Sequence, residues 1–145
     1  MASPQLHGLD ALQRTLAAEH AAVFVFGALG GRASALTSEP LRSALTTAYD
    51  VHVQRRDRLR PMVQAAGGTP VAAEPAYRLP RPLTTAAQIE AEALRVERAC
   101  VTTYAALVAA TAGAARRWAV DALIATAVSE SAFGGRPEAL PGLAT

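Results

Sequence analysis

The chain has 145 residues, of which 51% are hydrophobic, and its formal net charge is +2. This length allows one domain with a hydrophobic core and is too short for two domains of ordinary size. So small a positive charge gives no support for nucleic-acid binding unless the basic residues cluster. With one cysteine the chain cannot form an intrachain disulfide, and nothing indicates an oxidising compartment.

Residues 1–9 contain neither the basic nor the apolar region of a signal peptide. The longest uncharged apolar stretch, residues 21–31, is shorter than the roughly 20 residues that a membrane helix needs. We therefore expect a cytoplasmic protein with no membrane association.

Apolar residues recur at three- and four-residue steps in the first segment, as in a helix with one buried face. They are Leu9, Leu12, Leu16, Val23 and Phe26. Similar patterns, bounded by capping residues and glycine pairs, predict four helices in a single domain covering residues 1–145. The helices are expected at about residues 5–32, 39–66, 85–111 and 114–133. Thr85 and Gln88 form a capping-box pattern at the start of the third.

The connection over residues 67–84 is rich in proline and shows no helical period. A helix over residues 39–66 is roughly 40 Å long, and about 16 extended residues span roughly 50 Å. The connection can therefore run the whole length of a bundle, which makes the second and third helices parallel. The expected fold is all-α: a ferritin-like four-helix bundle of two antiparallel hairpins joined by a long proline-rich crossover.

Glu19 lies within the apolar stripe of the first helix. A carboxylate at a buried position costs several kcal/mol unless it is paired, protonated or bound to a metal. The sequence must therefore supply a partner for Glu19 from another helix.

Distances along the chain from the predicted turns, near residues 35 and 113, place four polar residues at one level of the bundle. Glu19 lies 16 residues before the first turn and His52 lies 17 after it. Glu97 lies 16 residues before the second turn and Glu130 lies 17 after it. Ferritin-like proteins hold a di-metal site at this level, so these four residues are the candidate metal ligands.

Three segments, residues 16–24, 52–57 and 75–80, carry a resemblance to a known family. Together with the organisation of the helices, they resemble a group of bacterial ferritin-like proteins of unknown function. The resemblance covers nearly the whole chain and implies the ferritin-like fold and a homodimer.

The sequence departs from the di-iron pattern at two ligand positions. Tyr49 stands three residues before His52, where the motif has Glu, and Phe133 stands three residues after Glu130, where the motif has His. The site is therefore a degenerate di-iron site.

Two interpretations of the remaining polar residues stay open. Two carboxylates and one imidazole suit a single iron, manganese or zinc ion. Alternatively, Arg55 or Arg56 replaces the charge of the metal and pairs with Glu19 and Glu97 in a metal-free ion-pair network. The sequence favours the second interpretation. We expect His20 to be a boundary or hydrogen-bonded histidine rather than a ligand, and Cys100 to be a small buried hydrophobe.

The sequence contains no catalytic triad, phosphate-binding loop or paired-cysteine motif and indicates no organic cofactor. It favours a non-catalytic, metal-free structural or interaction module over an enzyme. One alternative is a mononuclear or degenerate dinuclear metal-binding protein with redox or oxygen chemistry. The other is an RNA- or phosphate-binding adaptor that uses the arginines at 55, 56, 58 and 60, although these do not form one stripe on a helix.

Overall fold

The computed structural model of the protein describes residues 4–33, 38–79 and 82–143. Within these ranges the chain forms four α-helices and one short 3₁₀ helix, and it forms no strand. The elements are α1 (Pro4–Ala33), α2 (Glu39–Ala65), α3 (Ala86–Ala110), α4 (Gly113–Ser129) and the 3₁₀ helix η1 (Glu130–Phe133). The all-helical class predicted from the sequence is therefore confirmed for the described part of the chain.

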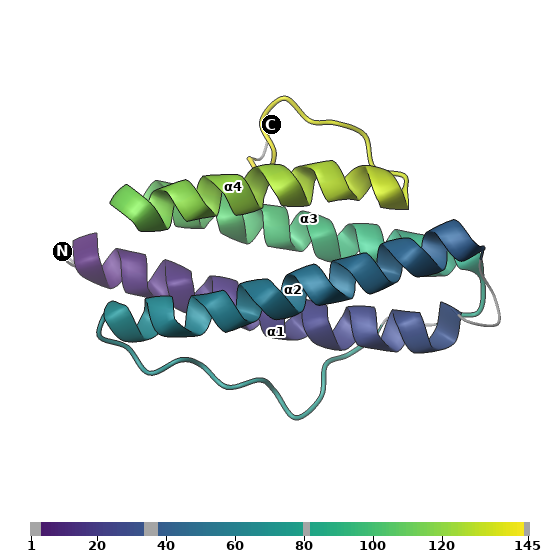
Figure 1. The fold of residues 1–145 in the computed structure, drawn as a ribbon, viewed down its shortest axis with the longest axis horizontal. Helices are drawn as coiled ribbons and strands as arrows, with labels where there is room; N and C mark the ends of the chain where they lie inside the picture. The colour runs from purple at the N-terminus through teal and green to yellow at the C-terminus, as the bar shows by residue number, and fades with distance from the viewer. Residues whose placement is uncertain (1–3, 34–37, 80–81, 144–145) are drawn as a thin grey trace.

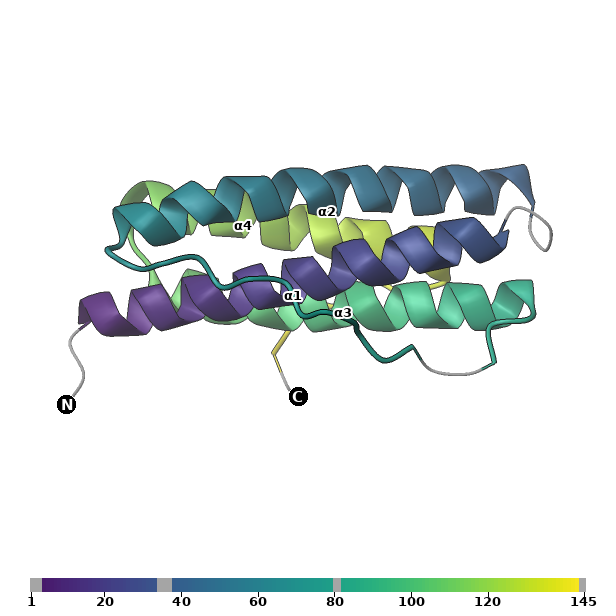
Figure 2. The ribbon, with the colours of Figure 1, turned by 90° about the horizontal axis from the view of Figure 1, so that it is seen from below.

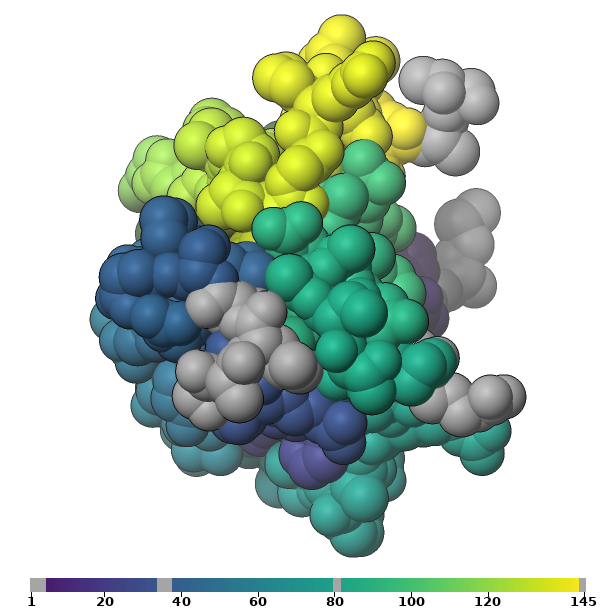
Figure 3. All heavy atoms as spheres, turned by 90° about the vertical axis from the view of Figure 1, so that its right-hand side faces the viewer, coloured from purple at the N-terminus to yellow at the C-terminus, as the bar shows by residue number. Residues whose placement is uncertain are grey.

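The four helices lie side by side along one axis (Figure 1). α1 and α2 run in opposite directions, and so do α3 and α4, whereas α2 and α3 run in the same direction. α1 packs against both α2 and α3, and α3 also packs against α4. Figure 3 views the molecule from the end at which α2 and α3 begin. In this view the C-terminal segment (yellow) lies over α3 and α4.

Helix boundaries follow the local sequence. α3 begins with the predicted capping box, in which the Thr85 side chain accepts from the Gln88 backbone N–H and the Gln88 side chain accepts from the Thr85 backbone N–H. The fourth helix was expected to continue to residue 133, but it is α-helical only to Ser129. Its last turn is the 3₁₀ helix η1. The helix ends there because Gly134 adopts a left-handed φ of 79° and the Gly135 N–H donates to the Glu130 carbonyl.

The core lies between the helices and is formed by their apolar stripes. Its largest fully buried apolar side chains are Phe26, Leu16, Leu29, Leu45, Leu59, Ile89, Leu107 and Tyr104. Polar side chains are buried among them at mid-length of the bundle, including Glu19, His52 and Glu97. No helix in the described part of the chain combines the length and apolar character required to cross a membrane.

The connection between α2 and α3 extends along the bundle and lies across α1 (Figure 2). Gln13 on α1 fixes its first part twice: the Gln13 amide donates to the Thr69 carbonyl at 2.6 Å and accepts from the Val71 N–H at 2.9 Å. His20 is buried and hydrogen-bonded, and its Nε2–H donates to the Val71 carbonyl at 3.0 Å. Burial and the charges of nearby arginines lower the pKa of His20, so the neutral ring holds the connection.

Replacing Gln13 with alanine removes both amide hydrogen bonds to the connection. We expect Gln13→Ala to lower the free energy of unfolding by about 1 kcal/mol, because the bonds are exposed, and to speed proteolysis between residues 66 and 79. Urea denaturation and limited proteolysis measure the two effects. Gln64→Ala is the matched control, because Gln64 is exposed on α2 and its side chain makes no hydrogen bond within the described residues. Equal loss of stability in the two variants would contradict this role for Gln13.

Candidate functional site

Glu19 is fully buried on α1 and both of its carboxylate oxygens accept short hydrogen bonds. His52 Nδ1 on α2 donates to Oε2 at 2.6 Å, and the Tyr104 hydroxyl on α3 donates to Oε1 at 2.6 Å. Three helices therefore meet at one carboxylate. The nearly equal distances of Glu19 and His52 from the first turn, 16 and 17 residues, agree with this contact, since helices have a constant rise per residue.

His52 lies between two carboxylates. Its second nitrogen, Nε2, is 3.5 Å from Oε2 of Glu97, and the ring of Phe26 stacks on the imidazole at a centroid distance of 5.1 Å. Burial opposes the charge on His52, but the hydrogen bond with Glu19 and the negative charges of Glu19 and Glu97 outweigh it and raise its pKa to about 9. The ring is therefore an imidazolium at neutral pH when only protein groups surround it.

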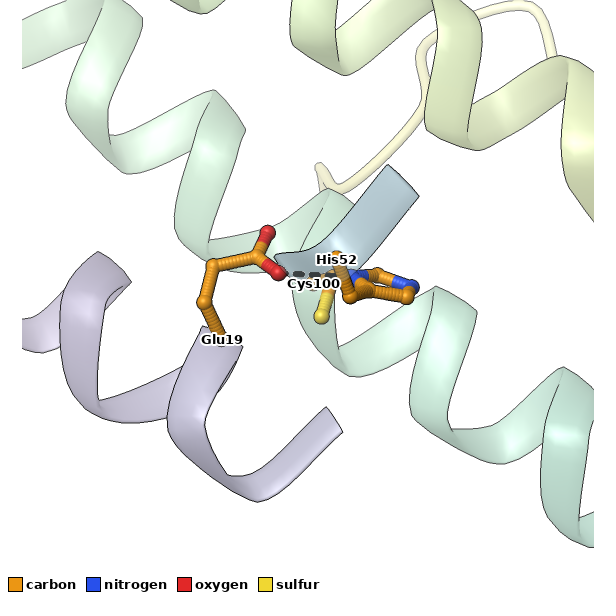
Figure 4. A group of neighbouring side chains, drawn as sticks. All are labelled: Glu19, His52 and Cys100. Carbon is orange, nitrogen blue, oxygen red and sulfur yellow. Dashed lines mark hydrogen bonds and ion pairs between the residues drawn. The ribbon is translucent and has the colours of Figure 1, made fainter. Parts of the chain in front are cut away.

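One face of α3 supplies three side chains to this site. Glu97, Cys100 and Tyr104 are spaced by three and four residues, which places them on the same side of a helix. The sulfur of Cys100 and ligand atoms of Glu19 and His52 all lie within 4.8 Å of one another (Figure 4). Burial, together with the negative charges of Glu19 and Glu97, raises the pKa of the Cys100 thiol well above its usual value.

Two buried atoms of the site have no hydrogen-bond partner within the described residues. They are Nε2 of His52 and Oε2 of Glu97, which lie 3.5 Å apart as an ion pair without a hydrogen bond. An unpaired polar atom in a protein interior is costly, so these two atoms mark the least satisfied part of the site.

Arg55 belongs to the site but does not pair with a carboxylate. Its guanidinium donates to the Thr126 hydroxyl at 2.7 Å and to the Ala122 carbonyl at 3.4 Å, both on α4, and lies 5.4 Å from the centre of the Tyr104 ring. The expected ion pair between Arg55 and Glu19 or Glu97 is therefore wrong for the described residues. The guanidinium ends on the far side of Tyr104 because its long stem reaches across to α4.

Arg56 also points away from the buried carboxylates. Its Nε donates to Asp57 at 2.9 Å, and Arg60 lies 3.5 Å from the same carboxylate. The sequence offered Arg56 as the other possible partner of Glu19 and Glu97, and this pairing is not formed. Arg55 is directed toward α4, whereas Arg56 and Arg60 share Asp57. These arginines of α2 therefore do not form one cationic stripe.

Glu130, the fourth candidate ligand, lies in η1 and is buried. Its Oε2 is 3.3 Å from Nε of Arg98 on α3. Burial raises the pKa of Glu130, and the Arg98 charge opposes that shift. Glu130 is therefore not brought into the cluster of Glu19, His52 and Cys100.

The two positions that lack a di-iron ligand are filled in different ways. Tyr49 is 38% exposed, and its ring lies beside Gly27 of α1, where no side chain blocks it. Phe133 is buried and packs against Phe26 at 5.8 Å. Neither residue belongs to the cluster of Glu19, His52 and Cys100.

A family model described as a domain of unknown function, DUF4439, matches residues 11–145. The chain belongs to this family. Its structure is similar to the crystal structure of a conserved hypothetical protein, rv2844, from Mycobacterium tuberculosis, with a TM-score of 0.81, 30% identity and 91% of each chain covered. Comparison with curated proteins finds no match.

In this DUF4439 chain, two ways of balancing the buried charges are chemically reasonable. The first keeps the imidazolium of His52 between two carboxylates, with Arg55 as the second cation. The second places a metal ion among the oxygen, nitrogen and sulfur donors of Glu19, His52 and Cys100, a donor set that divalent transition metals bind. Sequence reasoning placed Cys100 and Tyr104 on the buried face of this helix but assigned both to packing, because an apolar stripe does not show which of its members face a polar group.

The metal-free DUF4439 domain should lose stability as the pH rises. Because the pKa of His52 is raised from 6.5 to about 9 in the folded protein, its stabilising charge is fully present below pH 6.5 and is lost as the pH approaches about 9. The free energy of unfolding of the wild type, relative to His52→Gln, should fall by on the order of 3 kcal/mol over this interval. Urea denaturation in EDTA at several pH values measures the difference.

The matched control for this experiment is His7→Gln, because His7 is an exposed histidine on α1. This variant should follow the pH dependence of the wild type. A constant difference in stability between the wild type and His52→Gln from about pH 6.5 to about pH 9 would contradict the buried imidazolium.

Proposed function

We propose that this chain is a ferritin-like four-helix bundle that binds a single metal ion in its buried polar layer. The polar layer is defined as Glu19, His52, Glu97, Cys100 and Tyr104. Glu19 and His52 hold the ion in this proposal, and Glu97 lies on the other side of the His52 ring.

The directions of the helices support the ferritin-like assignment. Two antiparallel hairpins, with α2 parallel to α3 and a long connection along the bundle, have the topology of ferritin-like folds (Figure 1). The polar layer lies at mid-length of the helices, which is where such bundles hold metal ions.

The observation that carries the metal proposal is the pair of unpartnered buried atoms, His52 Nε2 and Glu97 Oε2. A network of protein groups alone leaves this pair 3.5 Å apart and unsatisfied. An ion bound at Nδ1 of His52 would leave Nε2–H directed at Glu97, which is the arrangement that orients most metal-binding histidines. The residues present therefore fit a metal ion, which when bound supplies a Lewis-acidic centre.

The polar residues have clear roles in this proposal. Glu19 supplies the carboxylate and His52 the imidazole, while the Tyr104 hydroxyl fixes the orientation of Glu19. Phe26 and the surrounding apolar core exclude water. We assign no catalytic residue, and the ion is proposed to be structural.

A second candidate function is a metal-free structural or interaction module, as the sequence favours. Its support is that both oxygens of Glu19 already accept hydrogen bonds at 2.6 Å from protein donors. Protonated His52 and Arg55 then offset the charges of Glu19 and Glu97. The two candidates make opposite predictions for added metal.

Added metal should stabilise the protein. We expect purified protein to contain a transition metal after growth in medium replete with iron, manganese and zinc. Protein stripped with a chelator should gain about 2.7 kcal/mol of stability when a binding ion is present at about 100 times its dissociation constant. Elemental analysis and thermal melts with Zn²⁺, Fe²⁺ and Mn²⁺ measure these effects.

Two variants separate the polar layer from general effects of charge. Glu19→Gln should abolish the stabilisation by metal. Glu90→Gln, an equal change at an exposed position of α3, should keep it. Absence of metal from the purified protein, together with unchanged melting temperatures for all three ions, would overturn the metal proposal and leave the metal-free module.

The homodimer that the sequence resemblance implies remains a proposal. Ile124 and Val128 lie one turn apart on α4 and are 57% and 67% exposed, so this helix offers an apolar surface for a second copy. We expect light scattering at micromolar concentration to give the mass of a dimer. Val128→Arg should give a monomer, whereas Gln54→Arg, which adds the same charge at an exposed position of α2, should remain dimeric. A monomeric wild type would contradict the proposal.

A further inference from the structure

Cys100 is fully buried in the polar layer, although its sequence context suggested only an apolar role. Its sulfur lies within 4.8 Å of ligand atoms of both Glu19 and His52. A carboxylate from α1, an imidazole from α2 and a thiol from α3 thus converge at one point (Figure 4).

We infer that Cys100 is a third protein ligand of the metal ion and that the site selects a thiolate-binding ion of the zinc class over manganese. This inference rests on the metal site proposed above and names its missing ligand and its metal class. Thiolate is a soft ligand that favours zinc and similar ions, whereas manganese and magnesium favour oxygen ligands. Carboxylate, imidazole and thiolate are all groups by which proteins bind zinc.

The neighbours of these three ligands are arranged as supporting groups. The Tyr104 hydroxyl donates to the Glu19 oxygen that does not face His52. Glu97 lies 3.5 Å from the His52 nitrogen that does not face Glu19. The Tyr104 hydrogen bond has the geometry by which second-layer groups orient a ligating carboxylate, and Glu97 is placed to do the same for His52. The unpartnered atoms of His52 and Glu97 then become a donor and its acceptor.

The charges of the polar layer balance both with and without the ion. Without it, Glu19 and Glu97 are offset by protonated His52 and by Arg55, and Cys100 is a neutral thiol. When a divalent ion binds, His52 and Cys100 each release one proton to solvent, and the ion takes the place of these two protons. The sum of charges stays at zero, because one thiolate is added, one imidazolium is lost and two positive charges arrive. Metal binding is therefore an exchange of one ion for two protons.

Cobalt(II) is a direct probe of this inference, because a cobalt–thiolate bond produces a charge-transfer absorption band in the near ultraviolet. The chain has one cysteine, so any such band reports on Cys100 alone. We expect chelator-stripped protein to bind Co²⁺ with this band, Zn²⁺ to remove the band by displacing cobalt, and about a tenfold excess of Mn²⁺ to leave it unchanged.

Two substitutions remove the thiol, and one control tests specificity. Cys100→Ser and Cys100→Ala should abolish the band and weaken Co²⁺ binding by at least about tenfold. Ala99→Ser, on the same helix at an exposed position, should keep both. Circular dichroism checks that each variant is folded.

The possible outcomes separate this inference from the proposed function. Cobalt bound without a charge-transfer band, or bound equally well by folded Cys100→Ser, would overturn the role of Cys100 and leave the metal site intact. Displacement of cobalt by equal Mn²⁺ would overturn the selectivity. Failure of Zn²⁺, Co²⁺ and Mn²⁺ to bind at all would overturn both proposals.

Discussion

Burial of the Glu19 carboxylate is the constraint on which the rest of the bundle depends. A charge at this depth is tolerated only when its oxygens are fully satisfied, and the donors come from two other helices. His52 fixes α2 and Tyr104 fixes α3 relative to α1, each at 2.6 Å. A shift of any helix by one residue would move a donor by about 1.5 Å and leave the carboxylate unpaired.

The same layer also holds the fourth helix in register. Arg55 crosses from α2 to α4, where it donates to Thr126 and Ala122, and its guanidinium lies over the ring of Tyr104. The hydroxyl of that ring holds Glu19, so a chain of contacts links all four helices. The apolar stripes favour burial in general, whereas these directional contacts specify one alignment of the helices.

The sequence predicted the position of a side chain in the bundle where that position follows from the regular rise of an α-helix. It did not predict positions that depend on the reach of a long side chain or on a change from α to 3₁₀ helix. Nearly equal distances from a turn predicted that Glu19 and His52 share a level, because every α-helical residue advances by the same rise. The method failed for Glu130, which lies in a 3₁₀ turn beside Arg98. It also failed for Arg55, because a long flexible side chain can reach either neighbouring helix.

Stability alone does not account for the composition of the polar layer. Apolar side chains of similar volume often stabilise a protein as well as a buried ion pair does, or better. Yet the layer keeps two carboxylates, an imidazole and a thiol within one apolar core, and two of its polar atoms have no partner in the described residues. Specifying helix register explains Glu19, His52 and Tyr104. It does not explain Glu97 or the thiol of Cys100, the two residues to which the proposed metal site gives a role.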